Sequence, residues 1–86
     1  MAHFAQINNN VVTEVIVIAN ADCDDLPFPE SEPVGQTYIN ALGIEGTWLQ
    51  CSYNANFRGC YPGPAYTFYP LLGEYGEFVA PPPIEE

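Results

Sequence analysis

The chain has 86 residues, enough for one domain with a single small core but not for two. Its 11 Asp and Glu residues stand against one Arg and no Lys, which gives a net charge of −10 at neutral pH. Because nucleic acids and anionic membranes are bound mainly through Lys and Arg, this composition excludes both as partners. The acidic charge either keeps the protein soluble or complements a basic partner surface. A hydrophobic content of 48% is too high for a disordered chain, so we expect a folded domain.

The sequence predicts a product of a reducing compartment. Residues 2–10 lack the basic and apolar regions of a secretory signal, and the longest apolar run, residues 15–19, is far too short to span a bilayer. The cysteines, Cys23, Cys51 and Cys60, are odd in number. We interpret them as small buried hydrophobic residues, with a Cys51–Cys60 disulfide as the alternative.

The amino-terminal residues predict a β-hairpin. Two β-rich runs, residues 3–7 and 11–19, flank three asparagines at 8–10. Asparagine tolerates the positive φ that tight hairpin turns require. The second run is nearly continuous in Val and Ile, which predicts a central strand with both faces covered.

Residues 21–33 predict an acidic loop, because three prolines prevent a regular helix through it. A short helix is predicted over residues 31–43, with Ser31 as its N-cap and Gly43 at its end. The side chains expected to face the sheet recur at helical spacing and are Val34, Tyr38, Ala41 and Leu42.

Residues 47–53 alternate in a way that is typical of a strand. One face of this strand is expected to carry Trp48, Gln50 and Ser52, and the other Leu49, Cys51 and Tyr53. An irregular turn punctuated by Gly and Pro follows.

Residues 66–72 and 77–80 predict a second hairpin, closed by two glycines. The elements in order predict a single β-rich α+β domain over residues 1–80. It contains about five strands, in two hairpins plus one strand, with one short helix packed on the sheet. Residues 81–86, PPPIEE, predict an extended, acidic, Pro-rich tail.

No motif in the chain predicts catalysis. The carboxylates cluster in loops, and His3 has no Ser or Cys beside it in a nucleophile motif, so we expect neither an enzyme nor a cofactor. Asp22, Asp24 and Asp25 are interpreted as a solvated acidic turn. The alternative, a divalent-cation site, lacks the central Gly and distal Glu of an EF-hand loop.

The one Arg, Arg58, lies in the most aromatic segment of the chain, residues 52–70. A lone Arg can lie against aromatic rings and pair with a carboxylate at the same time. We expect Phe57, Tyr61 and Tyr66 to form this aromatic nest. Arg58 then either braces an intramolecular turn or belongs to a partner-binding platform, since Tyr, Trp and Arg dominate interface hot spots.

The sequence resembles a family of small virion-associated proteins of tailed phages, especially cyanophages. The resemblance rests on MAHFAQINNNVVTEVIVIAN at 1–20, ESEPVGQTYINALG at 30–43, TWLQCSYNANFRGCYPGPAYTF at 47–68 and FVAPPP at 78–83, which together cover most of the chain. The family's aromatic motif is matched here by Ser52, Tyr53, Asn54, Asn56, Phe57, Arg58, Tyr61, Gly63, Tyr66 and Thr67. Two features depart from the family: Gly59 stands where the family has a Lys, and the sequence ends at PPPIEE, where the family has a tail that contains Trp after the proline stretch.

The resemblance implies a virion protein on the outer capsid surface, made in the host cytoplasm. It implies a decoration (cement) protein that bridges subunits of the major capsid protein and forms a homo-oligomer, with a trimer as the expected form. A tail or neck component and a host-glycan-binding module, using Trp48, Tyr61, Tyr66 and Tyr69 as exposed plates, are the alternatives. The expected partner-binding residues are Trp48, Phe57, Arg58, Tyr61, Tyr66, Pro81 and Pro82.

Overall fold

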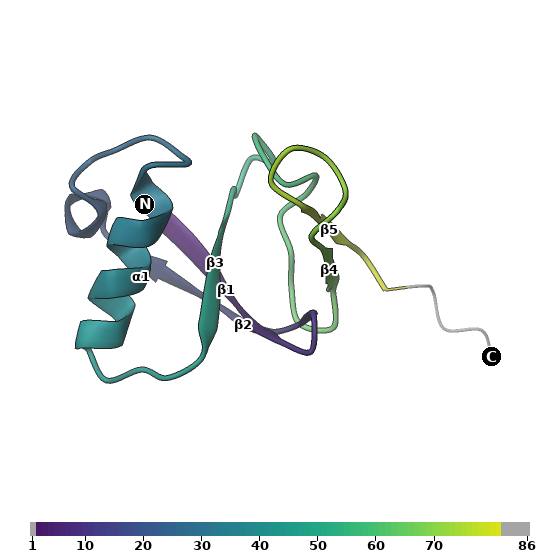
Figure 1. Ribbon diagram of the computed structural model, residues 1–86, viewed down its shortest axis with the longest axis horizontal. Helices are drawn as coiled ribbons and strands as arrows, with labels where there is room; N and C mark the ends of the chain where they lie inside the picture. The colour runs from purple at the N-terminus through teal and green to yellow at the C-terminus, as the bar shows by residue number, and fades with distance from the viewer. Residues whose placement is uncertain (1, 82–86) are drawn as a thin grey trace.

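The computed structural model describes residues 2–81, which contain five strands and one α-helix. In chain order the elements are β1 (Ala2–Asn8), β2 (Val11–Ile18), the 3-10 helix η1 (Asn20–Cys23), α1 (Ser31–Ala41), β3 (Thr47–Cys51), β4 (Thr67–Tyr69) and β5 (Glu77–Val79). The strands form one antiparallel sheet in the order β3-β1-β2-β4-β5. In Figure 1, α1 lies at one end of the molecule beside β1, β2 and β3, and the β4–β5 hairpin lies at the other end. The predicted α+β fold, with two hairpins, one further strand and one helix, is confirmed.

The first hairpin turns at its asparagines, as predicted. Asn9 and Asn10 have φ angles of 53° and 65°, the left-handed conformation that a tight two-residue turn requires. Gln6 and Ile7 are neighbours on β1, but their partners on β2 are Glu14 and Val12, so one extra residue forms a β-bulge. Because of the bulge, Val12 and Ile18 point to opposite faces of the sheet, although they lie an even number of positions apart along β2.

The prediction that β2 is a central strand is confirmed, because it lies between β1 and β4. Its faces are covered only in part. Val12 and Ile18 are 1% and 7% exposed, but Val17 is 47% exposed.

The helix has the predicted extent but a different buried face. It begins at Ser31 and ends at Ala41, followed by Gly43 with φ 80°. The predicted N-cap role of Ser31 is wrong: its hydroxyl donates to Oε1 of Gln50 at 2.6 Å, and Glu30 occupies the cap position. The residues that face the sheet, four apart, are Ser31, Gly35 and Ile39, whereas the predicted Leu42 is 54% exposed, Ala41 is exposed, and Val34 and Tyr38 are half-buried.

Gly35 explains the shift of this face. A Cβ added at Gly35 would lie 2.7 Å from Cε1 of Phe4 and 3.0 Å from Sγ of Cys23. Because glycine has no Cβ, the helix approaches the sheet closely at this point. The stripe of larger side chains, which the helical pattern placed toward the sheet, lies to one side of it.

The core divides into two clusters, one on each face of the sheet. The cluster under α1 contains Ala2, Phe4, Ile18, Cys23, Ile39 and Trp48. The cluster on the opposite face contains Ala5, Val12, Cys51, Phe68 and Phe78. The predicted alternation of β3 is confirmed, since Trp48 packs in the first cluster while Cys51 and half-buried Leu49 pack in the second.

All three cysteines are free thiols, so the alternative Cys51–Cys60 disulfide is not formed. Cys23 and Cys51 are buried, as predicted for small hydrophobic residues, and Cys60 is half-buried. The second predicted hairpin is confirmed as β4 and β5, but β4 ends at Tyr69, so residues 70–72 of the predicted strand belong to the connecting loop. In the described residues, no helix has the length and hydropathy to cross a membrane.

Candidate functional site

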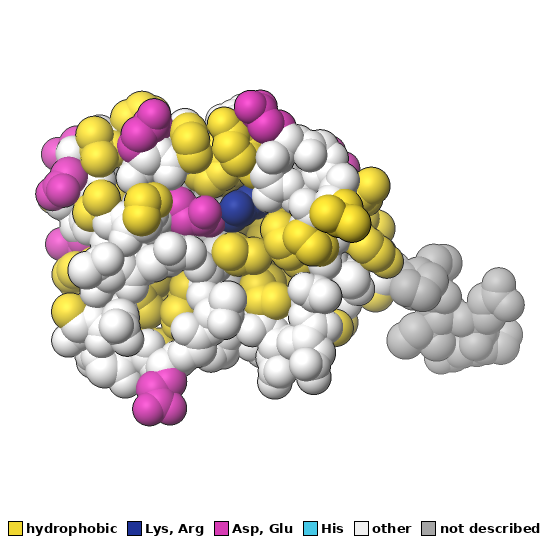
Figure 2. Space-filling view, viewed as in Figure 1, with side chains coloured by type: hydrophobic (Ala, Val, Ile, Leu, Met, Phe, Trp, Pro, Cys, Tyr) yellow, Lys and Arg dark blue, Asp and Glu magenta, His cyan; other side chains and the backbone are white. Residues whose placement is uncertain are grey.

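Arg58 is buried. Its side chain is 7% exposed and forms an ion pair with Glu32 in the first turn of α1. The Glu32 side chain is 16% exposed. The contact is bidentate, because Nη1 donates to Oε2 and Nη2 donates to Oε1 at 3.2 Å. In Figure 2 the chain's one dark-blue side chain appears as a small spot beside a magenta acidic side chain and among yellow apolar ones.

Two further guanidinium hydrogens donate to backbone carbonyls, each in a different element. Nη1 also donates to the carbonyl of Gln50 in β3 at 2.8 Å, and Nε donates to the carbonyl of Tyr75 in the β4–β5 loop at 3.0 Å. Four of the five guanidinium N–H groups therefore have partners inside the protein. Arg58 joins the helix, an outer strand and the second hairpin.

The ion pair also covers the free edge of β3. Since β3 is an outer strand, the backbone groups that face away from β1 need other partners. The Gln50 N–H donates to Glu32 Oε2 at 2.7 Å, and the Gln50 carbonyl accepts from Arg58. Along the same strand, Nε2 of Gln36 donates to the Trp48 carbonyl at 2.6 Å. These side chains take the place of an additional strand and close the edge to strand addition.

The backbone around Arg58 covers the other edge of the sheet. The Phe78 N–H in β5 donates to the Arg58 carbonyl at 2.9 Å, and the Cys60 thiol donates to the Phe78 carbonyl at 3.1 Å. Arg58 adopts a left-handed φ of 58°. It therefore contacts both outer strands, β3 through its side chain and β5 through its carbonyl.

The aromatic rings around Arg58 come from other segments than predicted. Its guanidinium carbon lies 5.1 Å from the ring centroid of Phe28 and 5.5 Å from that of Phe68. Phe28, from the loop before α1, stacks on Phe57 with ring centroids 3.8 Å apart. The prediction that Phe57, Tyr61 and Tyr66 surround Arg58 is therefore wrong. The rings that make cation–π contacts with it are those of Phe28 and Phe68.

Tyr61 belongs to a separate aromatic group near the start of β1. Its ring centroid lies 5.4 Å from that of His3 and 5.2 Å from that of Tyr53. A shallow hollow of about 430 Å³ adjoins this group, and its lining includes Asn54 and Asn56 but no described carboxylate. Burial, with the charge of the chain's amino terminus, lowers the pKa of His3, and burial raises the pKa of Tyr61, so both rings are uncharged at neutral pH.

The thiols are poor nucleophiles. Burial raises the pKa of Cys51 to about 12 despite the opposing charge of Arg58, and it also raises the pKa of Cys23 and Cys60. All three are protonated at neutral pH. Within residues 2–81, no three or more His, Cys, Asp or Glu side chains gather in a way that could hold a metal ion.

The expected partner-binding residues do not form one exposed surface. Trp48 is 4% exposed and packs under α1, so its predicted exposure is wrong. Three of the other expected residues are half-buried: Phe57, Tyr61 and Tyr66. Pro81 is exposed, and Pro82, with the rest of the predicted tail, lies outside the described residues.

Sequence reasoning named only Tyr69 from the group of apolar side chains that is the most exposed in residues 2–81. We call it the hairpin patch, and it consists of Tyr69, Leu71, Leu72, Tyr75 and Val79 on β4, β5 and their connecting loop. Leu71 is 94% exposed. The available signal was a Leu-Leu pair placed directly between a proline and a glycine, where a turn cannot bury it.

Sequence reasoning expected a carboxylate beside Arg58 but did not identify which Asp or Glu it is. Glu32 is one of two acidic residues beside the buried Ser31, and only the closed fold brings it to Arg58, 26 positions away.

Comparisons of the chain with protein-family models, with curated proteins and with solved structures found no match.

Proposed function

We propose that this protein is a non-enzymatic structural component of a phage virion. In this proposal it decorates the outer capsid surface, where it bridges subunits of the major capsid protein and stabilises the head. The resemblance of residues 1–20, 30–43 and 47–68 to small virion proteins supports the virion assignment.

The burial of Arg58 is the observation that carries the proposal. Among the described residues, Glu32 is the only carboxylate that forms an ion pair. Because that pair is internal, the surface offers no Arg or Lys side chain to bind phosphate. Such a surface is repelled by packaged DNA and favours a place on the outside of the shell, against basic patches of other proteins.

Binding energy alone would perform this function. One small domain contributes a modest affinity at each contact, and a copy that spans neighbouring subunits gains from the high effective concentration of the second contact. Assembly in turn stabilises the domain, because a partner that binds only the folded state shifts its folding equilibrium.

A glycan-binding module is the second candidate, favoured by the hollow beside Tyr53. Tyr53 is 66% exposed, and Asn54 and Asn56 supply amide groups beside it. Of the four plates expected from the sequence, only Tyr69 is exposed, because Trp48 is buried and Tyr61 and Tyr66 are half-buried.

Co-sedimentation with capsid heads tests the proposal. We expect the protein to pellet with heads, and to do so less as salt is raised from about 0.1 M to about 1 M, because the screening length falls from about 10 Å to about 3 Å. Thermal melts at both salt concentrations control for a change in folding. Failure of the protein to pellet with heads at low salt would contradict the proposal. If the pelleted fraction does not change with salt, the acidic surface serves solubility and not binding.

A further inference from the structure

Among the described residues, exposed apolar side chains are most concentrated in the β4–β5 hairpin, which carries the hairpin patch. Of the eleven large hydrophobic residues that are exposed in the described chain, five lie within residues 69–79. The other six are spread over β2, the loops and the end of α1, as is usual for single apolar residues on a surface. In Figure 2 yellow side chains continue from the centre of the molecule to its right side, where Figure 1 places the β4–β5 hairpin.

The loop that carries the patch is held in place before any partner binds. Nε of Arg58 binds the Tyr75 carbonyl, and the Tyr75 ring meets Phe28 edge-on at a centroid distance of 4.9 Å. At Gly76, with φ 81°, an added Cβ would lie 2.9 Å from Cε1 of Phe68, so the loop closes tightly on the core. A preorganised surface of this kind loses little entropy when it binds.

Strand addition does not explain the exposure of this hairpin. The outer edge of β5 is occupied at Phe78 by the Arg58 carbonyl and the Cys60 thiol, and the edge of β3 is occupied by Glu32, Gln36 and Arg58. A partner must therefore recognise the side chains of the patch.

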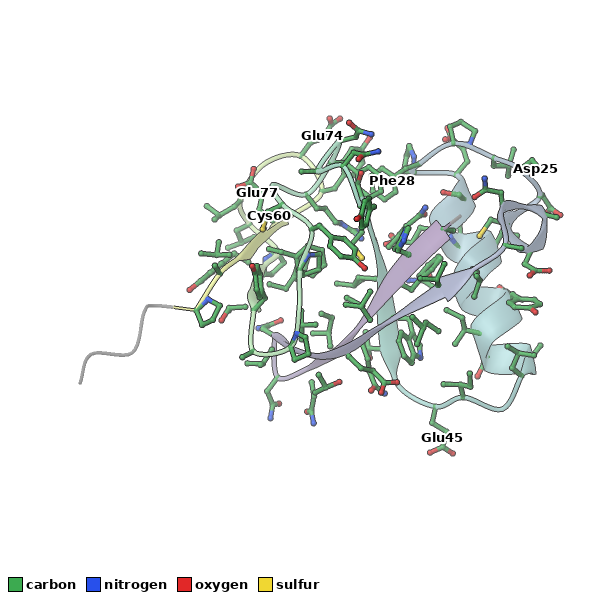
Figure 3. All side chains as sticks on the ribbon, turned by 180° about the vertical axis from the view of Figure 1, so that it is seen from behind. Asp25, Phe28, Glu45, Cys60, Glu74 and Glu77 are labelled. Atoms are coloured by element: carbon green, nitrogen blue, oxygen red, sulfur yellow. The ribbon has the colours of Figure 1, made fainter. Side chains whose placement is uncertain are left out.

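Two carboxylates lie beside the patch and indicate the charge of its partner. Glu74 is exposed in the loop, and the Glu77 carboxylate lies against Gly73, where an added Cβ would come within 2.8 Å of Oε2. Figure 3 shows both on the hairpin side of the molecule, away from Asp25 and Glu45. A second copy would bring the same two carboxylates to the contact, so like-charge repulsion disfavours self-association through this surface.

We propose that the protein docks through the hairpin patch into an apolar recess rimmed by Lys or Arg on the outer face of the capsid shell. This inference rests on the proposed function and names its contact surface. Leu71 is the anchor that enters the recess, and Glu74 pairs with the basic rim.

The test compares two matched double variants in the co-sedimentation assay. We expect Leu71→Ser/Leu72→Ser to lower the affinity for heads at least about tenfold, because it removes the central apolar anchors. Leu26→Ser/Leu42→Ser makes the same change at exposed leucines outside the patch and should leave the affinity unchanged. Both variants should keep the wild-type melting temperature, since none of the four side chains is buried.

A charge pair of variants tests the basic rim. Glu74→Lys should weaken binding, and Glu45→Lys, at an exposed site far from the hairpin (Figure 3), should weaken it much less. Equal binding by wild type and Leu71→Ser/Leu72→Ser would overturn the docking surface and leave the proposed function standing. Tighter binding by Glu74→Lys would overturn the basic rim. Self-association of the wild type that Leu71→Ser/Leu72→Ser abolishes would assign the patch to a second copy, and no binding by the wild type would overturn the docking surface and the proposed function together.

Discussion

Replacing Arg58 by Met is expected to destabilise the fold by about 3 kcal/mol, because it leaves the half-buried Glu32 carboxylate without its counter-charge. A small domain has a free energy of unfolding of only about 5–15 kcal/mol, so the variant should be largely unfolded or close to it near 37 °C. The loss extends beyond the ion pair, since the Gln50 and Tyr75 carbonyls also lose their donor. Urea denaturation followed by circular dichroism measures the change.

A double variant separates the ion pair from the rest of the site. In Glu32→Leu/Arg58→Met no buried charge remains, so it should be more stable than Arg58→Met alone, although the Gln50 N–H then lacks an acceptor. A double variant no more stable than the single one would contradict the account of the pair. If Arg58→Met instead kept its stability and lost only its binding to heads, Arg58 would belong to the partner platform and not brace the fold.

Gly35→Ala is expected to cost about 1–3 kcal/mol through overpacking, even though alanine is the better helix former by about 1 kcal/mol. The new methyl group would press on the ring of Phe4, which is 0% exposed and packed in the core. The effect should therefore be opposite to the stabilisation that this substitution usually brings to a helix. Thermal melts of the variant and the wild type give the sign directly.

Two further variants control this experiment. Phe4→Leu/Gly35→Ala removes the ring atoms nearest the new methyl group, so Gly35→Ala should cost less stability in the Phe4→Leu background than in the wild type. Gly63→Ala is the matched glycine, because the nearest atom to its new Cβ is Tyr66 Cε1 at an ordinary 3.8 Å, and it should be neutral or slightly stabilising. A neutral Gly35→Ala would mean that the helix can move away from the sheet at no cost.

Local signals predicted the elements of this fold because each depends on neighbouring residues. The asparagines at 9 and 10 adopt the positive φ that a tight turn needs, and Gly43 follows the helix end with a positive φ. The alternation of β3 reflects the two-residue repeat of a strand between two packed layers. No contact with a distant segment is required for any of these.

The site was harder to predict because it is built from contacts between distant segments. Glu32 and Phe28 come from the helix and the loop before it, yet both surround Arg58. The helix face was misassigned for the same reason: a small residue, Gly35, lies closest to the sheet, whereas a hydrophobic pattern marks large residues as the buried ones. Exposure of Leu71 follows from the geometry of a turn, which hydrophobicity alone does not reveal.

The copy number of the protein in purified particles is the decisive measurement for its proposed place on the capsid surface. Quantitative mass spectrometry gives its molar ratio to the major capsid protein. If the proposed function holds, we expect a ratio near one or a simple fraction of one, because every equivalent position on the shell would offer the same recess. A handful of copies per particle would place the protein in the tail or neck, and its absence from the particles would contradict the virion assignment.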